Sequence, residues 1–254
     1  MVNVVVTRKI WIVENLLKGL ENLIFPKKCL NCGDAGSYLC FFCADKVEYV
    51  EEPTCIICGG ISMGGFTHYS CQTKYTPNRL VSAFKYKGVI RKALKMAKYK
   101  TKVFSIYNDL VNLAVEHFNE INLQIGEEAI VVPVPIHWKK FVSRTFNHSE
   151  VIANLFAQKY GINVVHALKK TKNTPSQSLL NRKERIKNVR GSFLVKRKAI
   201  DKISGKDVII IDDICTTGAT LLSASKTLRE LGKRGPRYIY CITLAYDYPK
   251  DLTR

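Results

Sequence analysis

The sequence contains no long apolar run. None of its stretches approaches the roughly 18 consecutive apolar residues of a membrane-spanning helix, so we expect no membrane span. The first residues place an apolar patch before the basic pair Arg8 and Lys9, which is the reverse of a secretory signal, so a cytoplasmic location is expected. With 46% hydrophobic and 24% charged residues in a chain of 254, the composition predicts a globular protein with one main domain and a smaller attachment.

Acidic residues are scarce beyond residue 80. Residues 1–80 contain 8 Lys/Arg and 7 Asp/Glu, whereas residues 81–254 contain 32 and 14, and the formal net charge is +19. The segment Phe84–Lys102 has 8 basic residues and no acid, and Lys169–Lys198 has 11 and one. A solvated basic surface is one interpretation. Because like charges repel, a phosphate-rich ligand or a nucleic acid is favoured as partner. The candidate nucleic-acid contacts are Lys85, Lys87, Arg91, Lys139 and Lys140.

Cysteines are nearly absent outside one segment, since seven of the nine lie between Cys29 and Cys71. The motifs CLNC, CFFC, CIIC and HYSC each place two potential ligands three positions apart. A tight turn can direct both at one ion, and zinc takes four such ligands in a tetrahedron, with His replacing Cys where needed. In a chain expected in the cytoplasm, clustered cysteines favour metal over disulfides. We therefore predict two structural zinc ions, with the ligands Cys29, Cys32, Cys40, Cys43, Cys55, Cys58, His68 and Cys71.

The way these ligands divide between the two ions is open. Sequential pairing joins the first four and the last four, whereas a cross-brace interleaves them. The short gap between the first two pairs favours the sequential arrangement. An ordinary surface role for His68 is the alternative that leaves the second site incomplete. We expect an N-terminal helical segment at 1–25, a double zinc-ribbon-like module at 26–75 and a larger domain at 80–248.

The larger domain alternates between apolar strand patterns and helical patterns. Strands are expected at 129–134, 162–168, 206–213 and 237–246, and helices at 89–99, 103–119, 147–160 and 217–231. This alternation predicts an α/β fold, a parallel sheet covered by helices, with ligands at the carboxyl ends of the strands.

The stretch VIIIDDICTTGATL, residues 208–221, has the strongest functional pattern. Its apolar run predicts a strand buried on both faces, and Asp212 and Asp213 then emerge at the ligand edge. The next residues turn into a helix whose N-terminus can bind phosphate, and Gly218 would let the backbone approach the ligand. Together the acids and the loop suit a phosphorylated sugar. The acid pair has three alternative roles: a Mg²⁺ site, a phosphoacceptor or a helix N-cap.

This stretch resembles the 5-phosphoribosyl-1-pyrophosphate (PRPP) motif of type I phosphoribosyltransferases. The resemblance implies that Asp212 and Asp213 bind the ribose 2- and 3-hydroxyls and that magnesium accompanies PRPP. The implied 5-phosphate loop is Cys215, Thr216, Thr217, Gly218, Ala219 and Thr220. The implied pyrophosphate loop is Pro133, Val134, Pro135, Ile136 and His137, with Arg144 just beyond it, and a simple strand-ending turn is the alternative. The implied flexible basic loop contains Gln177, Arg182, Arg185 and Asn188, for which a solvated loop is the alternative.

A second resemblance covers most of the chain. Several segments occur in the order found in the ComF/ComFC (GntX-like) family of competence proteins. They are the cysteine motifs, FKYKG (84–88), residues 132–157, residues 174–193 and the PRPP motif. That resemblance implies the handling of single-stranded DNA during natural transformation, with other DNA-uptake proteins as further partners. Thr145, His148 and His68 depart from the family pattern.

Two functions follow from these patterns. One is a single-stranded DNA-handling protein that binds PRPP. The other is an active phosphoribosyltransferase with an unidentified nucleobase or amine acceptor and pyrophosphate as product. The sequence identifies no catalytic residue, and His137 and His148 are general-base candidates by position only.

Overall fold

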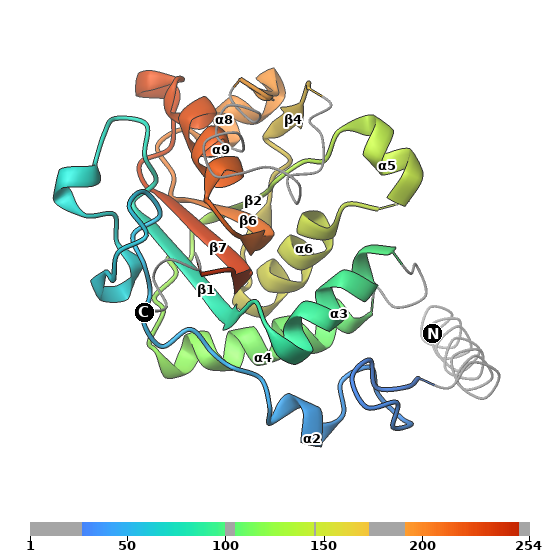
Figure 1. Cartoon of the computed structure of the whole chain (residues 1–254). Helices are drawn as coiled ribbons and strands as arrows, with labels where there is room; N and C mark the ends of the chain where they lie inside the picture. Colours follow the sequence, from blue (N-terminus) through green and yellow to red (C-terminus); the bar gives the residue numbers. More distant parts are fainter. Residues whose placement is uncertain (1–26, 100–104, 145, 173–190, 249–254) are drawn as a thin grey trace, which may run out of the picture. The chain divides into compact units, whose positions relative to one another are not determined.

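The computed structural model describes residues 27–99, 105–144, 146–172 and 191–248 (Figure 1). These residues form two compact units, of which the first ends at Lys46 and the second begins at Val47. The first unit contains helix α2 (Phe41–Ala44) and an isolated bridge between Lys28 and Ala35. The boundary at Lys46 falls inside the module expected at 26–75, so the second group of cysteines belongs to the same unit as the sheet.

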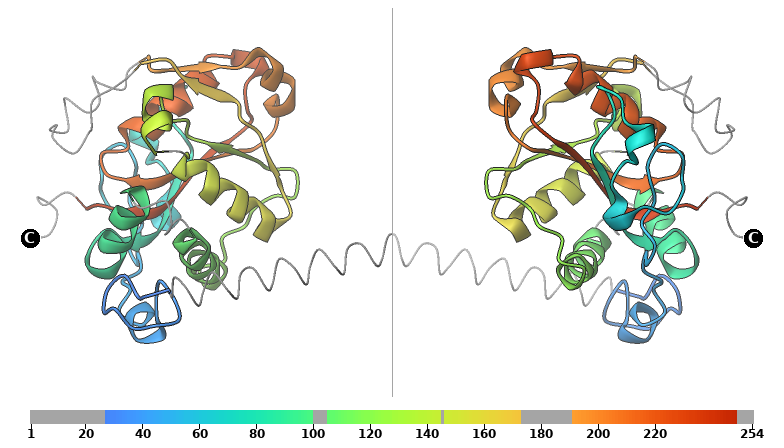
Figure 2. Two further views of the ribbon diagram at one scale, coloured as in Figure 1. Left: turned by 90° about the vertical axis from the view of Figure 1, so that its right-hand side faces the viewer. Right: turned by 90° about the vertical axis from the view of Figure 1, so that its left-hand side faces the viewer.

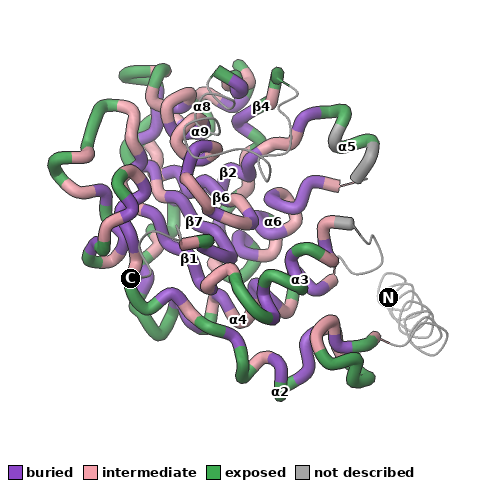
Figure 3. The backbone as a smooth tube through the Cα atoms, viewed as in Figure 1, coloured by how far each residue is buried: buried purple, intermediate pink, exposed green. Residues whose placement is uncertain are grey.

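A five-stranded sheet forms the centre of the second unit. Its order is β1-β7-β6-β2-β3, and all neighbouring strands are parallel. The strand bounds are β1 (Arg79–Lys85), β7 (Ile239–Tyr246), β6 (Val208–Cys215), β2 (Ile130–Pro133) and β3 (Asn163–Val164). The expected α/β fold is confirmed. The central strands are continuous apolar runs because both of their faces are covered, as the buried strands in Figure 3 show.

Helices cover the two faces of this sheet (Figures 1 and 2). Helices α4 (Ile106–Glu120) and α6 (His148–Tyr160) pack on one face, and α3 (Gly88–Tyr99) contacts α4. Helix α9 (Ala219–Arg229) follows β6 directly and packs on the opposite face. A strand followed by a helix that returns over the sheet is the unit that brings loops to the carboxyl edge.

Several parts of the fold differ from the sequence expectations. The strand expected at 162–168 is divided between β3 and β4 (Leu168–Lys170), and β4 pairs antiparallel with β5 (Phe193–Val195). Strand β1 and helix α5 (Trp138–Arg144) were not anticipated. The remaining short elements are η1 (Met63–Gly65), η2 (Tyr69–Cys71), η5 (Arg197–Ala199), α8 (Ile200–Ile203) and η6 (Gly232–Arg234). Among the described residues, no helix has the length and apolar character needed to cross a membrane.

Candidate ligand site and metal centres

The acid pair lies inside β6, because the strand continues to Cys215 rather than ending at residue 213 as expected. One carboxyl oxygen of Asp212 accepts hydrogen bonds from the Ser149 hydroxyl at 2.7 Å and from the Asp213 amide at 3.0 Å. The Asp213 carboxylate forms an ion pair with Lys98 Nζ at 2.5 Å. The two acids therefore have different partners, and these come from α6 and α3.

Burial dominates the electrostatics of this pair. Burial raises the pKa of Asp212 to about 6, and the neighbouring Asp213 charge adds to the rise, while the Ser149 hydrogen bond opposes it. Burial also disfavours the charge of Lys98, but Asp213 outweighs it and raises the pKa of Lys98. Lys98 is thus a fixed positive charge at the acid pair, and Asp212 is a carboxyl group that titrates near neutral pH.

The predicted phosphate loop and one of the two acids line a common pocket at the carboxyl end of β6. Gly218 has a left-handed backbone with φ of 71°, and α9 begins at the next residue. The Ala219 amide donates to the Thr217 hydroxyl oxygen at 3.4 Å. The residues that line the pocket are Asp212, Ile214, Cys215, Thr216, Gly218, Ala219, Thr220 and Leu221. A hydroxyl acceptor and a helix N-terminus therefore line one shallow hollow of about 20 Å³. This hollow has the groups that a phosphorylated sugar needs, but such a ligand would extend well beyond it.

The predicted pyrophosphate loop, 133–137, lies beside β6. The Val134 amide donates to the carbonyl of Ile211 at 2.9 Å, and the Asn147 side chain donates to the carbonyl of Val134 at 3.0 Å. His137 is buried, and its Nδ1 accepts a hydrogen bond from the Lys139 amide at 3.3 Å. His148 is also buried, with its ring against Phe146 and Tyr107. These contacts give both histidines a packing role.

Several predicted residues lie outside what the structure describes. The side chains of Lys140 and Arg144 in α5 are among them. All four predicted residues of the basic loop fall in the stretch 173–190, which is also outside the described residues: Gln177, Arg182, Arg185 and Asn188. Their roles stay predictions.

A cavity of about 400 Å³ opens at the same edge of the sheet, between the ends of β1 and β7. It is lined by Glu51, Glu52, Lys85, Tyr86, Lys87, Tyr246, Asp247 and Tyr248. The Asp247 amide donates to the carbonyl of Cys215 at 2.8 Å, so the cavity adjoins the phosphate loop. Burial raises the pKa of the Tyr86 hydroxyl, and both Lys98 and Asp213 act on it, so the cavity also adjoins the acid pair.

Neither this cavity nor two partners of the acid pair, Ser149 and Lys98, was predicted from the sequence. Ser149 lies in the segment 132–157 that carries the second resemblance, so its position in the sequence could have marked it as a site residue. Lys98 is one of eight basic residues in Phe84–Lys102, and nothing in the sequence distinguishes it. Of the lysines predicted to contact nucleic acid, Lys87 forms an ion pair with Glu48 at 2.6 Å.

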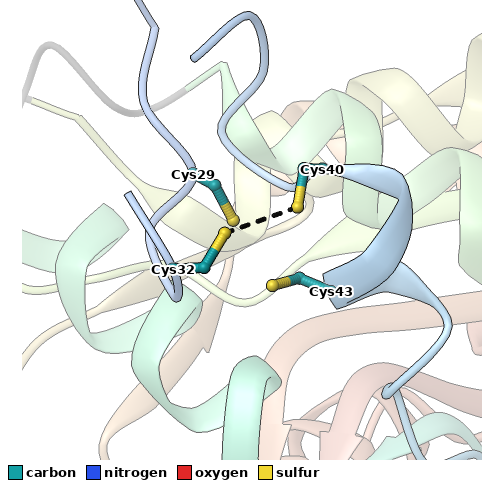
Figure 4. A group of neighbouring side chains, drawn as sticks. All are labelled: Cys29, Cys32, Cys40 and Cys43. Atoms are coloured by element: carbon teal, nitrogen blue, oxygen red, sulfur yellow. Dashed lines mark hydrogen bonds between the residues drawn. The ribbon is translucent and has the colours of Figure 1, made fainter. Parts of the chain in front are cut away.

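The first cysteine group is a fitting zinc site. The side chains of Cys29, Cys32, Cys40 and Cys43 converge, and their sulfur atoms lie within 4.8 Å of one another (Figure 4). Cys32 and Cys40 sulfurs are 3.6 Å apart, close to the ~3.8 Å edge of a tetrahedral zinc–thiolate site. Burial opposes ionisation of Cys29, but hydrogen bonds from backbone amides outweigh it and lower its pKa to about 6. The thiolate is the form that binds metal.

The second group contains Cys55, Cys58, His68 and Cys71, whose ligand atoms also lie within 4.8 Å of one another. His68 Nδ1 is 3.3 Å from the Cys58 sulfur, and Nε2 lies 3.0 Å from the carbonyl of Ile61. Because a carbonyl only accepts, Nε2 carries the proton and Nδ1 turns its lone pair toward the cluster, as in metal-binding histidines. Both clusters use ligands adjacent in sequence, which is the sequential arrangement.

Known protein families match two parts of the chain. Residues 20–72 match the double zinc ribbon domain, and residues 147–252 match the phosphoribosyl transferase domain. Competence protein F of Haemophilus influenzae is 25% identical over 82% of this chain and 93% of its own length. Competence protein ComFC of Bacillus subtilis is 23% identical over 77% and 79%, and DNA utilization protein YhgH of Escherichia coli is 23% identical over 68% and 75%. With the parallel sheet and the two cysteine groups, these matches identify the chain as a member of the ComF family, with a type I phosphoribosyltransferase fold and an N-terminal double zinc ribbon.

Proposed function

We propose that this protein binds PRPP and handles single-stranded DNA during DNA uptake in the cytoplasm. One observation carries the first half: Asp212 and most of the predicted phosphate loop, all but Thr217, line one pocket. A carboxylate can accept the sugar hydroxyls while the N-terminus of α9 receives the 5-phosphate. Asp213, paired with Lys98, is the second acceptor once the ion pair rearranges.

Magnesium would accompany the ligand and neutralise its pyrophosphate. The chain's own residues would then bind and orient. In this proposal the 133–137 loop, anchored to β6 through Val134, holds the pyrophosphate end. Arg182 and Arg185 of the predicted basic loop are further cations for this anion. Preorganised N–H groups and cations favour an anionic ligand at such a site.

The binding experiment is a melting curve with and without Mg·PRPP. A ligand at about 100 times its Kd stabilises by about 2.7 kcal/mol, so a rise in Tm is expected for the wild-type protein. The double variant Asp212→Ala, Asp213→Ala should lose this rise. Asp207→Ala is the matched control, because Asp207 precedes the same strand at its other end and pairs with Arg237. A full Tm rise in the double variant would place the ligand elsewhere.

Charge and exposed aromatic groups support the DNA half of the proposal. Trp138 and Phe141 of α5 are 64% and 48% exposed, and Lys139 lies 5.7 Å from the Trp138 ring centre. Aromatic faces beside cations suit unstacked bases on a phosphate backbone. The names of the relatives, competence proteins and a DNA utilization protein, agree with such a partner.

A second candidate function is phosphoribosyl transfer, which the cavity between β1 and β7 favours. An acceptor seated there would lie beside the acid pair, with the tyrosines Tyr86, Tyr246 and Tyr248 around it. In the transfer, the bond from the anomeric carbon to pyrophosphate breaks, a bond to the acceptor forms, and the acceptor loses a proton. Release of pyrophosphate on adding a panel of nucleobases, amines and nucleic acids separates the candidates: turnover supports transfer, whereas PRPP binding without turnover supports the DNA-handling role.

A further inference from the structure

Gly218, the residue before α9, lies directly against the turn between Cys55 and Cys58. A methyl group added at Gly218 would lie 2.8 Å from Cγ1 of Ile56 and 3.3 Å from the carbonyl oxygen of the same residue. Carbon atoms in contact are normally about 3.5 Å apart or more, so 2.8 Å is a clash. Gly218, which was predicted to let the backbone approach a ligand, thus makes room for the turn between Cys55 and Cys58.

Ile56 is held on both sides. Its neighbour Cys55 and the following Cys58 are ligand candidates of the second cluster, and the Gly59 amide donates to the carbonyl of Cys55 at 2.8 Å to close the turn. The Ile56 side chain is 4% exposed and belongs to the same core cluster as Cys215 and Ala219. Any movement of the turn therefore moves a side chain that packs on the phosphate loop.

Other contacts hold the second ribbon in place without the metal. The Tyr248 hydroxyl donates to the carbonyl of Glu52 at 3.0 Å, and the Ser225 hydroxyl donates to the carbonyl of Tyr75 at 3.0 Å. These hydrogen bonds secure both ends of the ribbon, one on the segment that follows β7 and the other on α9. The turn that carries Ile56 lies between them, and its shape depends on the two cysteines that flank it.

We propose that Ile56 is a positioning residue, which the second zinc fixes and which in turn holds the 215–220 loop in its anion-binding conformation. This inference rests on the proposed function of the loop as the phosphate seat. Anion binding at a helix N-terminus requires several N–H groups directed at one point. When Ile56 is displaced or truncated, the loop loses the surface against which that conformation packs.

The coupling must act in both directions, because a coupling free energy between two sites is mutual. A phosphoribosyl ligand that favours the ordered loop also favours the ordered turn, and so it slows loss of the second zinc. The first cluster belongs to the other compact unit, and its zinc serves as the internal reference.

The first experiment measures Mg·PRPP affinity by calorimetry in three variants. Ile56→Ala should bind about tenfold more weakly at full zinc content, within the usual 5- to 150-fold range of such couplings. Ile56→Val keeps a γ-methyl group toward Gly218 and should restore most of the affinity. Ile61→Ala is the matched control, since Ile61 is in the same ribbon with a side chain 67% exposed. Unchanged affinity in Ile56→Ala overturns the proposal.

The second experiment uses the wild-type protein and does not depend on a variant folding. Zinc release after thiol modification is followed with a chromogenic chelator, with and without Mg·PRPP. One of the two ions should leave several-fold more slowly with the ligand, and the other at its original rate. Equal release curves overturn the coupling alone if calorimetry shows that PRPP binds. Absence of PRPP binding to the wild-type protein overturns the proposed function as well.

Discussion

At the residue scale, Asp212 links ligand binding to pH. Burial, with help from the Asp213 charge, raises its pKa from 3.8 to about 6. Only the ionised carboxyl group accepts hydroxyl hydrogen bonds with both oxygens. The affinity for PRPP should therefore rise as pH increases through about 6.

Replacement by Asn tests this pH dependence. Asp212→Asn should remove the protein's part of the pH profile and leave only the titration of the ligand phosphates. Folding favours protonated Asp212, so its contribution to stability is present below pH 3.8 and is lost as pH rises through 6. The variant should gain stability relative to wild type over that interval. Calorimetric titrations at about pH 5–8 measure the affinity, and denaturant unfolding at about pH 3.5–7 measures the stability. Parallel profiles in the two proteins contradict the assignment.

A second residue-scale prediction separates backbone strain from steric clash at Gly218. Gly218 and Gly205 have nearly equal φ values, 71° and 69°, but a methyl group at Gly205 would meet no atom within 4 Å. Gly205→Ala should cost about 1 kcal/mol of unfolding free energy, from the left-handed conformation alone. Gly218→Ala should cost about 3 kcal/mol, because overpacking against Ile56 adds to the strain. Urea denaturation measures the unfolding free energy of both variants. Equal losses argue against a tight contact between Gly218 and the turn that carries Ile56.

At the element scale, the long strands and helices were predictable because their periodicity reflects burial on the sheet. Strands β6 and β7 and helix α9 fall where the apolar patterns placed them, within two residues. Strand β1 was missed because Ser82 and its charged ends interrupt the apolar run. The hydroxyl of Ser82 is satisfied by Thr243 at 2.7 Å on β7, far away in sequence. No local pattern encodes that pairing.

The candidate site shows the same division between local and distant signals. The acid pair and its loop are one continuous stretch, and the motif identified them together. Lys98 and Ser149 contact the acids from separate helices. The cavity at Tyr86 is lined jointly by the ends of β1 and β7 and by Glu51 and Glu52, which lie between the two cysteine groups. Such arrangements depend on strand order, which the spacing of residues in one sequence does not specify.

The two zinc ribbons allow a prediction of metal content at the element scale. Two groups of four ligands should give about two zinc ions per chain. His68→Ala should leave about one, because Nδ1 completes the second group, while His166→Ala, an exposed histidine beside Glu150, should keep both. Elemental analysis of purified protein decides this. Two tightly held ions in His68→Ala would remove the histidine from the ligand set.

At the scale of the whole molecule, the uneven charge predicts a salt-sensitive affinity for single-stranded DNA. Most of the net charge of +19 lies beyond residue 80. Each phosphate neutralised contributes about −0.7 to the slope of log K against log salt, so four or five contacts give a slope near −3.

Fluorescence anisotropy with a labelled oligonucleotide measures this slope. Trp138→Ala should weaken binding by about 1–3 kcal/mol through lost stacking while leaving the slope unchanged. Tyr238→Ala removes another exposed ring, 45% exposed against 64% for Trp138, just before the amino end of β7, and is the control. A flat salt dependence would argue that the basic surface serves another purpose.

The pairing of β1 with β7 also affects how the chain folds. Residues 79–85 and 239–246 lie side by side in the sheet, although most of the second unit separates them in sequence. Contacts of such high sequence separation form slowly, because the loop entropy is lost before the contacts stabilise anything. During synthesis the ribbons emerge well before β7 and α9, so we expect the ribbons to fold first, around metal. Strand β1 then lacks its sheet partner until β7 has been synthesised.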